Sequence, residues 1–201
     1  MTSPEKQAFR MDVLRELGNI GSGRAATALS QLLNRRIEMK VPQVHVMTYS
    51  ELLDSRGGPD VPMNTVVIDV HGDVEGRMFF MLHLWSVERL VELMLGERNG
   101  IEQLSEMAYS FLFEMGNILV SSYFSSLSDL TGLKMSVSIP RLSIDMLGAI
   151  LGEGLAEMEQ LDNKVIVIDA EILEGQDRIE GAFCFIPLPT SMDVLFRALG
   201  V

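Results

Sequence analysis

The sequence predicts an α+β (mixed α/β) fold, in which pseudo-twofold-related copies of one unit form a single mixed or antiparallel sheet with helices packed on it. Two observations support this prediction. Long segments with helical spacing alternate with short extended segments, and the same order of segments occurs twice in 201 residues. Two copies are too few for a solenoid. We therefore expect one domain over 1–201, made of two repeats at about 1–98 and 99–201.

The repeat is clearest in a five-residue match. Residues 16–20 read ELGNI and residues 114–118 read EMGNI, at a spacing of 98. From 14 to 42, nine of 29 positions are identical at this spacing without a gap, where roughly two are expected from residue frequencies. Further along, the spacing grows to 100 at 66–69 and to 105 at 75–76. We attribute this growth to loops, which absorb insertions most easily.

Each copy is expected to open with a long helix. Apolar residues recur at helical spacing over about 4–33, and Asn34 follows as a residue that tolerates the left-handed conformation just past a helix end. The second helix is expected from the N-cap Ser105 to about 130. Gly132 then stands where the first copy has Asn34, which supports both helix ends.

Three glycines lie inside the first helix. Gly18, Gly21 and Gly23 each cost about 1 kcal/mol relative to alanine in a helix interior. Either the helix breaks at the last two, or these positions allow close backbone packing. The second copy has Leu119 and Ser121 at the places of Gly21 and Gly23, so a required break is disfavoured. We expect two long helices that cross closely, with small residues at the crossing.

The remaining segments follow in the same order in both copies. Each has an extended segment around a proline, a short helix, a β-hairpin and a closing helix, and the short helix is expected to be longer in the second copy. The first copy has extended 35–48, helix 50–54, strands 65–70 and 77–84, and helix 86–95. The second copy has extended 135–144, helix 145–160, strands 165–171 and 179–186 around a loop at 173–177, and helix 191–199.

Composition argues against several classes of function. Sixteen basic and 28 acidic side chains leave a formal charge of −12, which disfavours binding to nucleic acid or to an anionic membrane surface. No apolar run reaches the ~18 residues of a membrane span, and the N-terminus lacks the order of a signal peptide. The single cysteine, Cys184, permits no internal disulfide. We therefore expect a cytoplasmic protein with Cys184 buried as a small apolar residue.

The repeated match places polar side chains on one helix face. Glu16 and Asn19 are three residues apart, and Asp12 lies four residues before Glu16, so that all three share a face. We call them the first stripe and expect it to be exposed on a rigid helix, which suits a precise site better than a loop does. The second stripe consists of Ser110, Glu114 and Asn117.

A single stripe of this kind is best explained as a solvated helix face. Asparagine is a poor helix former because its side chain competes with the backbone for hydrogen bonds. Its occurrence in mid-helix twice, with the same glutamate, favours a function. We expect Gly18 and Gly116, each next to the asparagine, to keep bulk away from its side chain. Leu14, Leu17 and Leu32 are expected to hold the first helix on the core.

The stripes resemble a known signature, Asp/Ser-x3-Glu-x2-Asn-x22-Pro, of the CheC/CheX/FliY family of bacterial chemotaxis phosphatases. The chain contains this signature twice with every spacing intact, and the resemblance covers almost the whole chain. The matching residues are Asp12, Glu16, Asn19 and Pro42 in the first copy and Ser110, Glu114, Asn117 and Pro140 in the second.

The resemblance implies hydrolysis of the aspartyl phosphate on the response regulator CheY, by insertion of the helix face into the regulator's active site. An acyl phosphate is already reactive, so the enzyme mainly has to position water and stabilise charge. Asn19 and Asn117 would orient the attacking water through amide hydrogen bonds without taking a proton. Glu16 and Glu114 would bind the partner by pairing with its active-site lysine.

The resemblance also bears on cofactors and partners. It implies that this chain binds no cofactor and that Mg²⁺ belongs to the partner regulator. His45, His71 and His83 are scattered and suggest no metal site. The family also implies a second partner, the receptor deamidase CheD. Candidate contacts for CheD, for which core packing is the alternative explanation, are Met146, Leu147, Ile150 and Leu151.

Two other functions stay open at this point. A non-enzymatic adaptor or regulator of CheD would act without hydrolysis, and replacing the asparagines should separate the two because deamidase binding would persist. A docking module for a receptor or the flagellar switch would bind unphosphorylated regulator or switch proteins and release no phosphate. We expect both stripes to function. Asp12 beside Glu16 would attract a basic group more strongly than Ser110 beside Glu114, but the sequence leaves open which site is stronger.

Overall fold

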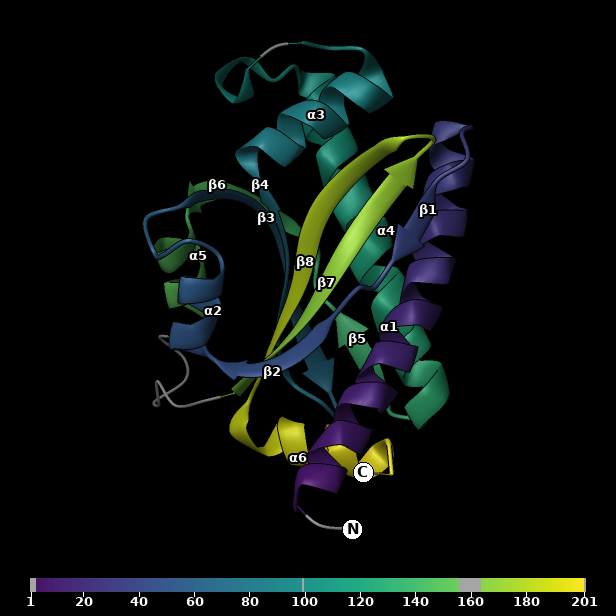
Figure 1. Cartoon of the computed structure of the whole chain (residues 1–201), viewed down its shortest axis with the longest axis vertical. Coiled ribbons are helices and arrows are strands. Elements are labelled where there is room, and N and C mark those ends of the chain that lie inside the picture. Colours follow the sequence, from purple (N-terminus) through teal and green to yellow (C-terminus); the bar gives the residue numbers. More distant parts are fainter. Residues whose placement is uncertain (1–2, 99, 156–163, 201) are drawn as a thin grey trace.

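The structure, a computed structural model, describes residues 3–98, 100–155 and 164–200. A central sheet separates two layers of helices (Figure 1). The long helices α1 (Ser3–Leu33) and α4 (Glu106–Thr131) cover one face of the sheet, and the short helices α2 (Tyr49–Ser55) and α5 (Leu147–Leu155) cover the other. Helices α3 (Leu84–Leu95) and α6 (Pro189–Ala198) lie at opposite ends of the sheet, and a 3-10 turn, η1 (Ile101–Gln103), precedes α4.

The described residues form an eight-stranded sheet in the order β1-β7-β8-β4-β3-β5. β2 continues the edge beside β1 along β7, and β6 does the same beside β5 along β3. Each neighbouring pair is antiparallel. The edge strands of each half therefore pair with the hairpin of the other half. The strands are β1 (Glu38–Lys40), β2 (Val44–Thr48), β3 (Pro62–Gly72), β4 (Gly76–His83), β5 (Met135–Val137), β6 (Arg141–Met146), β7 (Lys164–Glu174) and β8 (Asp177–Pro187).

One row of paired residues crosses the sheet and passes through corresponding strands of the two halves, whichever end it is followed from. At its centre Phe80 on β4 pairs with Phe183 on β8, with ring centroids 4.8 Å apart. Outward from this pair, Val66 on β3 and Ile168 on β7 occupy matching places. The row ends in the edge strands, and its full order is Val44, Ile168, Phe183, Phe80, Val66 and Leu142.

The row corrects the alignment of the two hairpins. Val66 corresponds to Ile168, a spacing of 102, whereas the sequence match at 66–69 indicated 100. A slip of two residues returns every strand side chain to the same face, so the apolar pattern alone does not reveal it. The swapped edges and the symmetric row support the interpretation of two repeats in one domain, which stays a prediction.

Both faces of the sheet are buried, which explains the near-continuous apolar runs in its strands. Val66 and Ile168 face the core under the long helices, whereas Val67 and Val167 face the smaller core under the short helices. Cys184 belongs to the smaller core and is fully buried, as expected. Burial raises the pKa of its thiol to about 12, so the thiolate that reacts with oxidants is not formed at neutral pH.

The two long helices cross closely, as the sequence indicated. α1 runs unbroken from Ser3 to Leu33. A Cβ atom at Gly21 would lie 2.9 Å from a ring carbon of Tyr123 and 3.2 Å from its Cα, so only glycine fits there. The buried hydroxyl groups of Ser22 and Tyr123 are 2.5 Å apart and form a hydrogen bond between the helices. Gly23 takes no part in the crossing, because no described atom outside its own stretch of α1 lies within 4 Å of a Cβ placed there.

Most helix ends and strands agree with the expected ranges to within three residues. Asn34 and Gly132 follow their helices with φ of 51° and 71°, and the Ser105 hydroxyl accepts the Ala108 N–H as an N-cap. The second hairpin has a shorter loop than expected, because β7 and β8 continue to Glu174 and Asp177.

The second short helix departs most from expectation. Asp145 and Met146 continue β6 and pair with β3, so α5 begins at Leu147 rather than at 145. The expected end of this helix, from 156 to 160, lies outside the described residues.

Candidate functional site

The two stripes lie on exposed faces of the long helices. Asp12, Glu16 and Asn19 of the first stripe are all exposed on α1. On α4, Ser110 and Glu114 are exposed and Asn117 is partly buried. The structure therefore brings each motif together as one helix face that a protein partner can reach.

The motif glycines hold each helix close to the sheet. A Cβ atom at Gly18 would lie 3.2 Å from Val41, and one at Gly116 would lie 2.3 Å from a methyl carbon of Val66. Both glycines are buried and face the sheet. Our expectation that they keep bulk away from the asparagine side chain is therefore wrong. They set the depth at which the helix lies on the sheet, and so fix the height of the stripe above the core.

The prediction that three leucines hold α1 on the core is correct for two of them. Leu14 and Leu17 are 1% and 6% exposed. Leu32 is 46% exposed, so the prediction that it faces the core is wrong. In that last turn Leu33 makes the core contact.

The motif prolines lie in the breaks between edge strands. Pro42 separates β1 from β2, and Pro140 separates β5 from β6. Proline has no N–H to donate to a strand ladder, which suits a break at a sheet edge. In the first half Val41 fills the space beside Gly18, so this loop lies directly under the helix turn that carries Asn19.

The charges around the two stripes differ in composition. The Arg15 guanidinium pairs with the Asp12 carboxylate at 3.0 Å, and both side chains are more than half exposed. In the second half the corresponding residues are Ser110 and Phe113, which carry no charge. Each stripe with this neighbour therefore has a formal charge of −1, from Glu16 and Glu114 respectively. Arg15 thus offsets the advantage that we expected Asp12 to give to the first stripe.

A contact that we did not predict involves the second asparagine. The Ser121 hydroxyl donates a hydrogen bond to the Asn117 Oδ1 at 3.4 Å. The first half has Gly23 at the corresponding place and Asn19 is more exposed than Asn117. The sequence contained a hint, because the two residues are four apart on a helix and therefore share a face.

Known proteins match the chain over these residues. A model of the CheC-like family matches residues 9–46, which include the first motif from Asp12 to Pro42. The CheY-P phosphatase CheC of Bacillus subtilis (strain 168) is 41% identical over 196 residues, which cover 95% of this chain and 94% of that protein. The chain belongs to the CheC-like family.

Two further comparisons bear on the family and the fold. The flagellar motor switch phosphatase FliY of Bacillus subtilis is 28% identical over 135 residues, which cover 66% of this chain and 35% of FliY. The crystal structure of Thermotoga maritima FliY has a TM-score of 0.77 at 23% identity, and the match covers 100% of this chain and 98% of that one. The α+β architecture described above is thus shared with this structure.

The four residues suggested as CheD contacts are mostly in the core. Leu147 and Leu151 are fully buried and Ile150 is 5% exposed, so core packing accounts for these three and they form no docking surface. Met146 is 52% exposed and is the one of the four that a partner can reach.

The histidines lie apart in the fold. His45 has its Nε2 3.5 Å from the Asp169 carboxylate, and His83 stacks on Trp85 with ring centroids 6.0 Å apart. Burial, aided by the charge of Arg56, lowers the pKa of His83. In the described part of the chain, no group of three or more His, Cys, Asp and Glu side chains is placed to hold a metal ion. Nor is any described helix both long enough and apolar enough for a membrane span.

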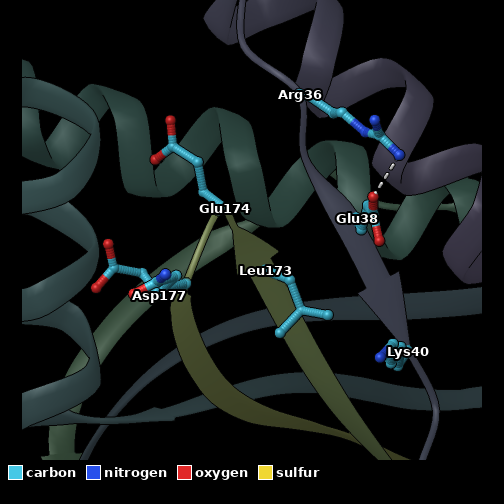
Figure 2. A pocket seen from close by; sticks show the side chains of 8 residues that line it. Arg36, Glu38, Lys40, Leu173, Glu174 and Asp177 are labelled. Atoms are coloured by element: carbon cyan, nitrogen blue, oxygen red, sulfur yellow. Dashed lines mark ion pairs between the residues drawn. The ribbon is translucent and has the colours of Figure 1, made fainter.

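An open hollow of about 690 Å³ lies between β1 and the β7–β8 turn (Figure 2). Arg36 and Glu38 form an ion pair at 2.8 Å, while Glu174 and Asp177 point away from that pair (Figure 2). Glu174 pairs instead with Arg35, and Asp177 pairs with Arg89. These charges are already paired within the chain, so the hollow is a weaker candidate site than the stripes.

Proposed function

We propose that the chain is a phosphatase that hydrolyses the aspartyl phosphate of a CheY-type response regulator. The observation that carries this proposal is the pair of Glu–Asn stripes, one on an outward face of each long helix, each next to a buried glycine that faces the sheet. The 41% identical relative is named as a CheY-P phosphatase, which supports the same reaction for this chain.

The shape of the site suits a reaction on another protein. Each stripe projects from a helix that the sheet supports over several turns, so the helix enters a partner's site without ordering a loop on binding. The asparagine amide then accepts one hydrogen bond from a water molecule and donates others, which places the water in line with the phosphorus. A bond forms between the water oxygen and phosphorus, the bond from phosphorus to the aspartyl oxygen breaks, and inorganic phosphate leaves.

The glutamates bind the partner rather than take part in bond making. Glu16 and Glu114 are exposed carboxylates one helical turn before the asparagines. A carboxylate at this place accepts a charge-assisted hydrogen bond from a lysine in the regulator's active site, which fixes the register of the helix in that site. The proposal assigns the Mg²⁺ that stabilises charge on the phosphoryl group to the regulator.

The direct test measures phosphate release from phosphorylated regulator with Mg²⁺, after subtraction of the regulator's own dephosphorylation rate. We expect the double variant Asn19→Ala/Asn117→Ala to lose about 100-fold of the chain-dependent rate, because the attacking water is no longer positioned. The control is the double variant Gln31→Ala/Gln103→Ala, which changes exposed amides outside the stripes and should keep full activity. Full activity in the asparagine double variant would refute the proposal.

The role of the glutamates has a separate signature. Glu16→Gln in the Asn117→Ala background, and Glu114→Gln in the Asn19→Ala background, should raise KM about ten-fold with a smaller change in kcat, since a charge-assisted bond is lost. The difference in KM between each variant and its parent should shrink at high salt, because screening weakens the charge-assisted bond in the parent. A loss confined to kcat would show that the carboxylate acts in the reaction itself.

Binding of a CheD-type deamidase stays a separate prediction. Of the four suggested contacts, Met146 is the exposed one, so it is the contact that this prediction keeps. The asparagine double variant distinguishes the functions, because it should lose hydrolysis and keep deamidase binding. Under the adaptor alternative, the double variant would change neither phosphate release nor deamidase binding.

A further inference from the structure

The two asparagines differ in what holds their side chains. Asn117 is partly buried, and its Oδ1 receives a hydrogen bond from the Ser121 hydroxyl at 3.4 Å. Asn19 is exposed, and the residue one turn further along its helix is Gly23. The residue four places after the asparagine therefore supplies a hydroxyl in the second half and nothing in the first.

The gap in the first half is open space rather than a filled site. Apart from the adjoining residues and the backbone of α1 itself, no atom of the described residues lies within 4 Å of a Cβ built at Gly23. A serine there would have room for its hydroxyl, and its place four residues after Asn19 would direct that hydroxyl along the stripe.

The contact at Asn117 leaves the amide able to act on water. An amide oxygen has two lone pairs, and the Ser121 hydroxyl uses one of them. One acceptor site and both N–H donors of Asn117 are therefore still available. At 3.4 Å the bond is long, as such bonds often are before a partner closes over the site.

We propose that Ser121 is a positioning residue for Asn117. Because Gly23, its counterpart in the first half, has no hydroxyl, the Asn19 side chain is the less ordered of the two. This inference rests on the proposed function. The hydroxyl restricts the rotation of the amide before the regulator arrives, so less conformational freedom is lost when the water is bound. Serine at this place thereby raises the rate at the second site without making any contact to the regulator.

The first test removes the hydroxyl in the Asn19→Ala background, where only the second site works. Ser121→Ala should lower kcat about two- to ten-fold, the range that one hydrogen bond to a neutral group supplies, while KM changes little. Ser121→Thr retains a hydroxyl at the same place and should keep most of the rate. Equal kcat for Ser121→Ala and its parent would overturn the proposal.

The second test adds the hydroxyl in the Asn117→Ala background, where only the first site works. Gly23→Ser should raise kcat about two- to ten-fold. Gly23→Ala is the matched control, since it supplies the same gain in helix propensity without the hydroxyl, and it should leave kcat unchanged. Equal effects of the two substitutions would show that helix stiffening, and not the hydrogen bond, is responsible.

A readout independent of catalysis separates this proposal from the proposed function. NMR relaxation of the side-chain amides should give a higher order parameter for Asn117 than for Asn19, and Ser121→Ala should remove the difference. If the amide is ordered by Ser121 but the asparagine double variant keeps full activity, the proposed function fails and with it the role in catalysis. If the asparagines are essential but neither kcat nor amide order responds to Ser121→Ala, only the positioning role fails.

Discussion

The two halves of the molecule are alike where the helix meets the sheet and different around the stripe. In both, a buried glycine lies on a matching residue of the symmetric row: Gly18 on Ile168 and Gly116 on Val66. The approach is closer in the second half, where a Cβ atom at Gly116 would lie 2.3 Å from Val66, than in the first, where one at Gly18 would lie 3.4 Å from Ile168. Both halves thus share the glycine that faces the sheet and the two side chains that would perform the chemistry.

The surroundings of the stripes have diverged. Val41, beside the first stripe's helix, is 8% exposed, whereas its counterpart Ile139 is 83% exposed. Arg15 likewise has Phe113 as its counterpart. The first stripe therefore has a charged neighbour where the second has an aromatic one, and the edge loop of the second half exposes an apolar side chain that the first half buries. Two helix faces with the same Glu–Asn pair thus offer a partner different surroundings.

The largest expected difference between the halves concerns the motif glycines. Gly116→Ala should destabilise the protein by about 2 kcal/mol, because the new methyl group would overlap the stiff side chain of Val66. Gly18→Ala should change the stability by less than about 1 kcal/mol, because Val41 needs to move only a few tenths of an ångström and helix propensity improves. Urea unfolding measures both, as changes in midpoint at a constant m value.

The control for this comparison is Gly23→Ala. No described atom beyond the adjoining turns of α1 lies near a Cβ at this position, so the substitution should stabilise the protein by about 1 kcal/mol through helix propensity alone. Equal unfolding free energies for Gly18→Ala and Gly116→Ala would show that the sheet adjusts freely under both helices. The idea that these glycines fix the height of the stripes would then be wrong.

The glycines also show how far the sequence could predict this site. Spacing alone identified the stripes and their exposure, except at the partly buried Asn117, because a helix places residues three and four apart on one face whatever lies beneath it. It could not show what lies on the opposite face of the helix. Gly18 and Gly116 are adjacent in sequence to the asparagines, yet they point to the sheet, because neighbours on a helix are 100° apart.

The errors in the fold have a similar origin. The helix ends at Asn34 and Gly132 follow from local backbone preference, and the sequence indicated both correctly. The two-residue slip between the hairpins depends on strand pairing across the halves, which a pattern of period two does not encode. The apolar residues of α5 were ambiguous for a similar reason, since Leu147 and Leu151 are buried in a second core to which both halves contribute side chains.

A second difference lies where the helices cross. Tyr123 packs against Phe183 with ring centroids 4.1 Å apart, whereas its counterpart in the first half is Ala25, which cannot ionise. Burial raises the pKa of Tyr123 to about 12, although the hydrogen bond with Ser22 opposes part of that rise. An unfolded chain loses this proton from about pH 10, whereas the folded chain keeps it until about pH 12.

The folded state should therefore lose stability as the pH rises from 10 to 12, by about 2 kcal/mol from this residue. The contribution is fully present below pH 10, since both states are then protonated. Denaturant unfolding at pH 9 and at pH 11.5 should show a smaller loss in Tyr123→Phe than in the parent. Cys184 titrates in the same alkaline window and is present in both proteins, so it does not affect the comparison. If the unfolding free energies of the parent and of Tyr123→Phe fell equally with pH, the pKa of Tyr123 would not be raised by folding, and its hydroxyl would be in contact with water.

The smallest expected effect tests the charged border of the first stripe. Arg15→Ala frees the Asp12 carboxylate from its 3.0 Å ion pair, so that two acidic side chains face the incoming basic group of the regulator. In the Asn117→Ala background this should raise kcat/KM about two-fold at low salt, and the gain should disappear at 0.5 M salt, where the Debye length is only about 4 Å. The same substitution in the Asn19→Ala background is the control and should change nothing, because only the second site then works. A gain that persists at high salt would attribute the effect to the lost bulk of Arg15, and the charge difference between the borders would then have no part in how the two sites meet the regulator.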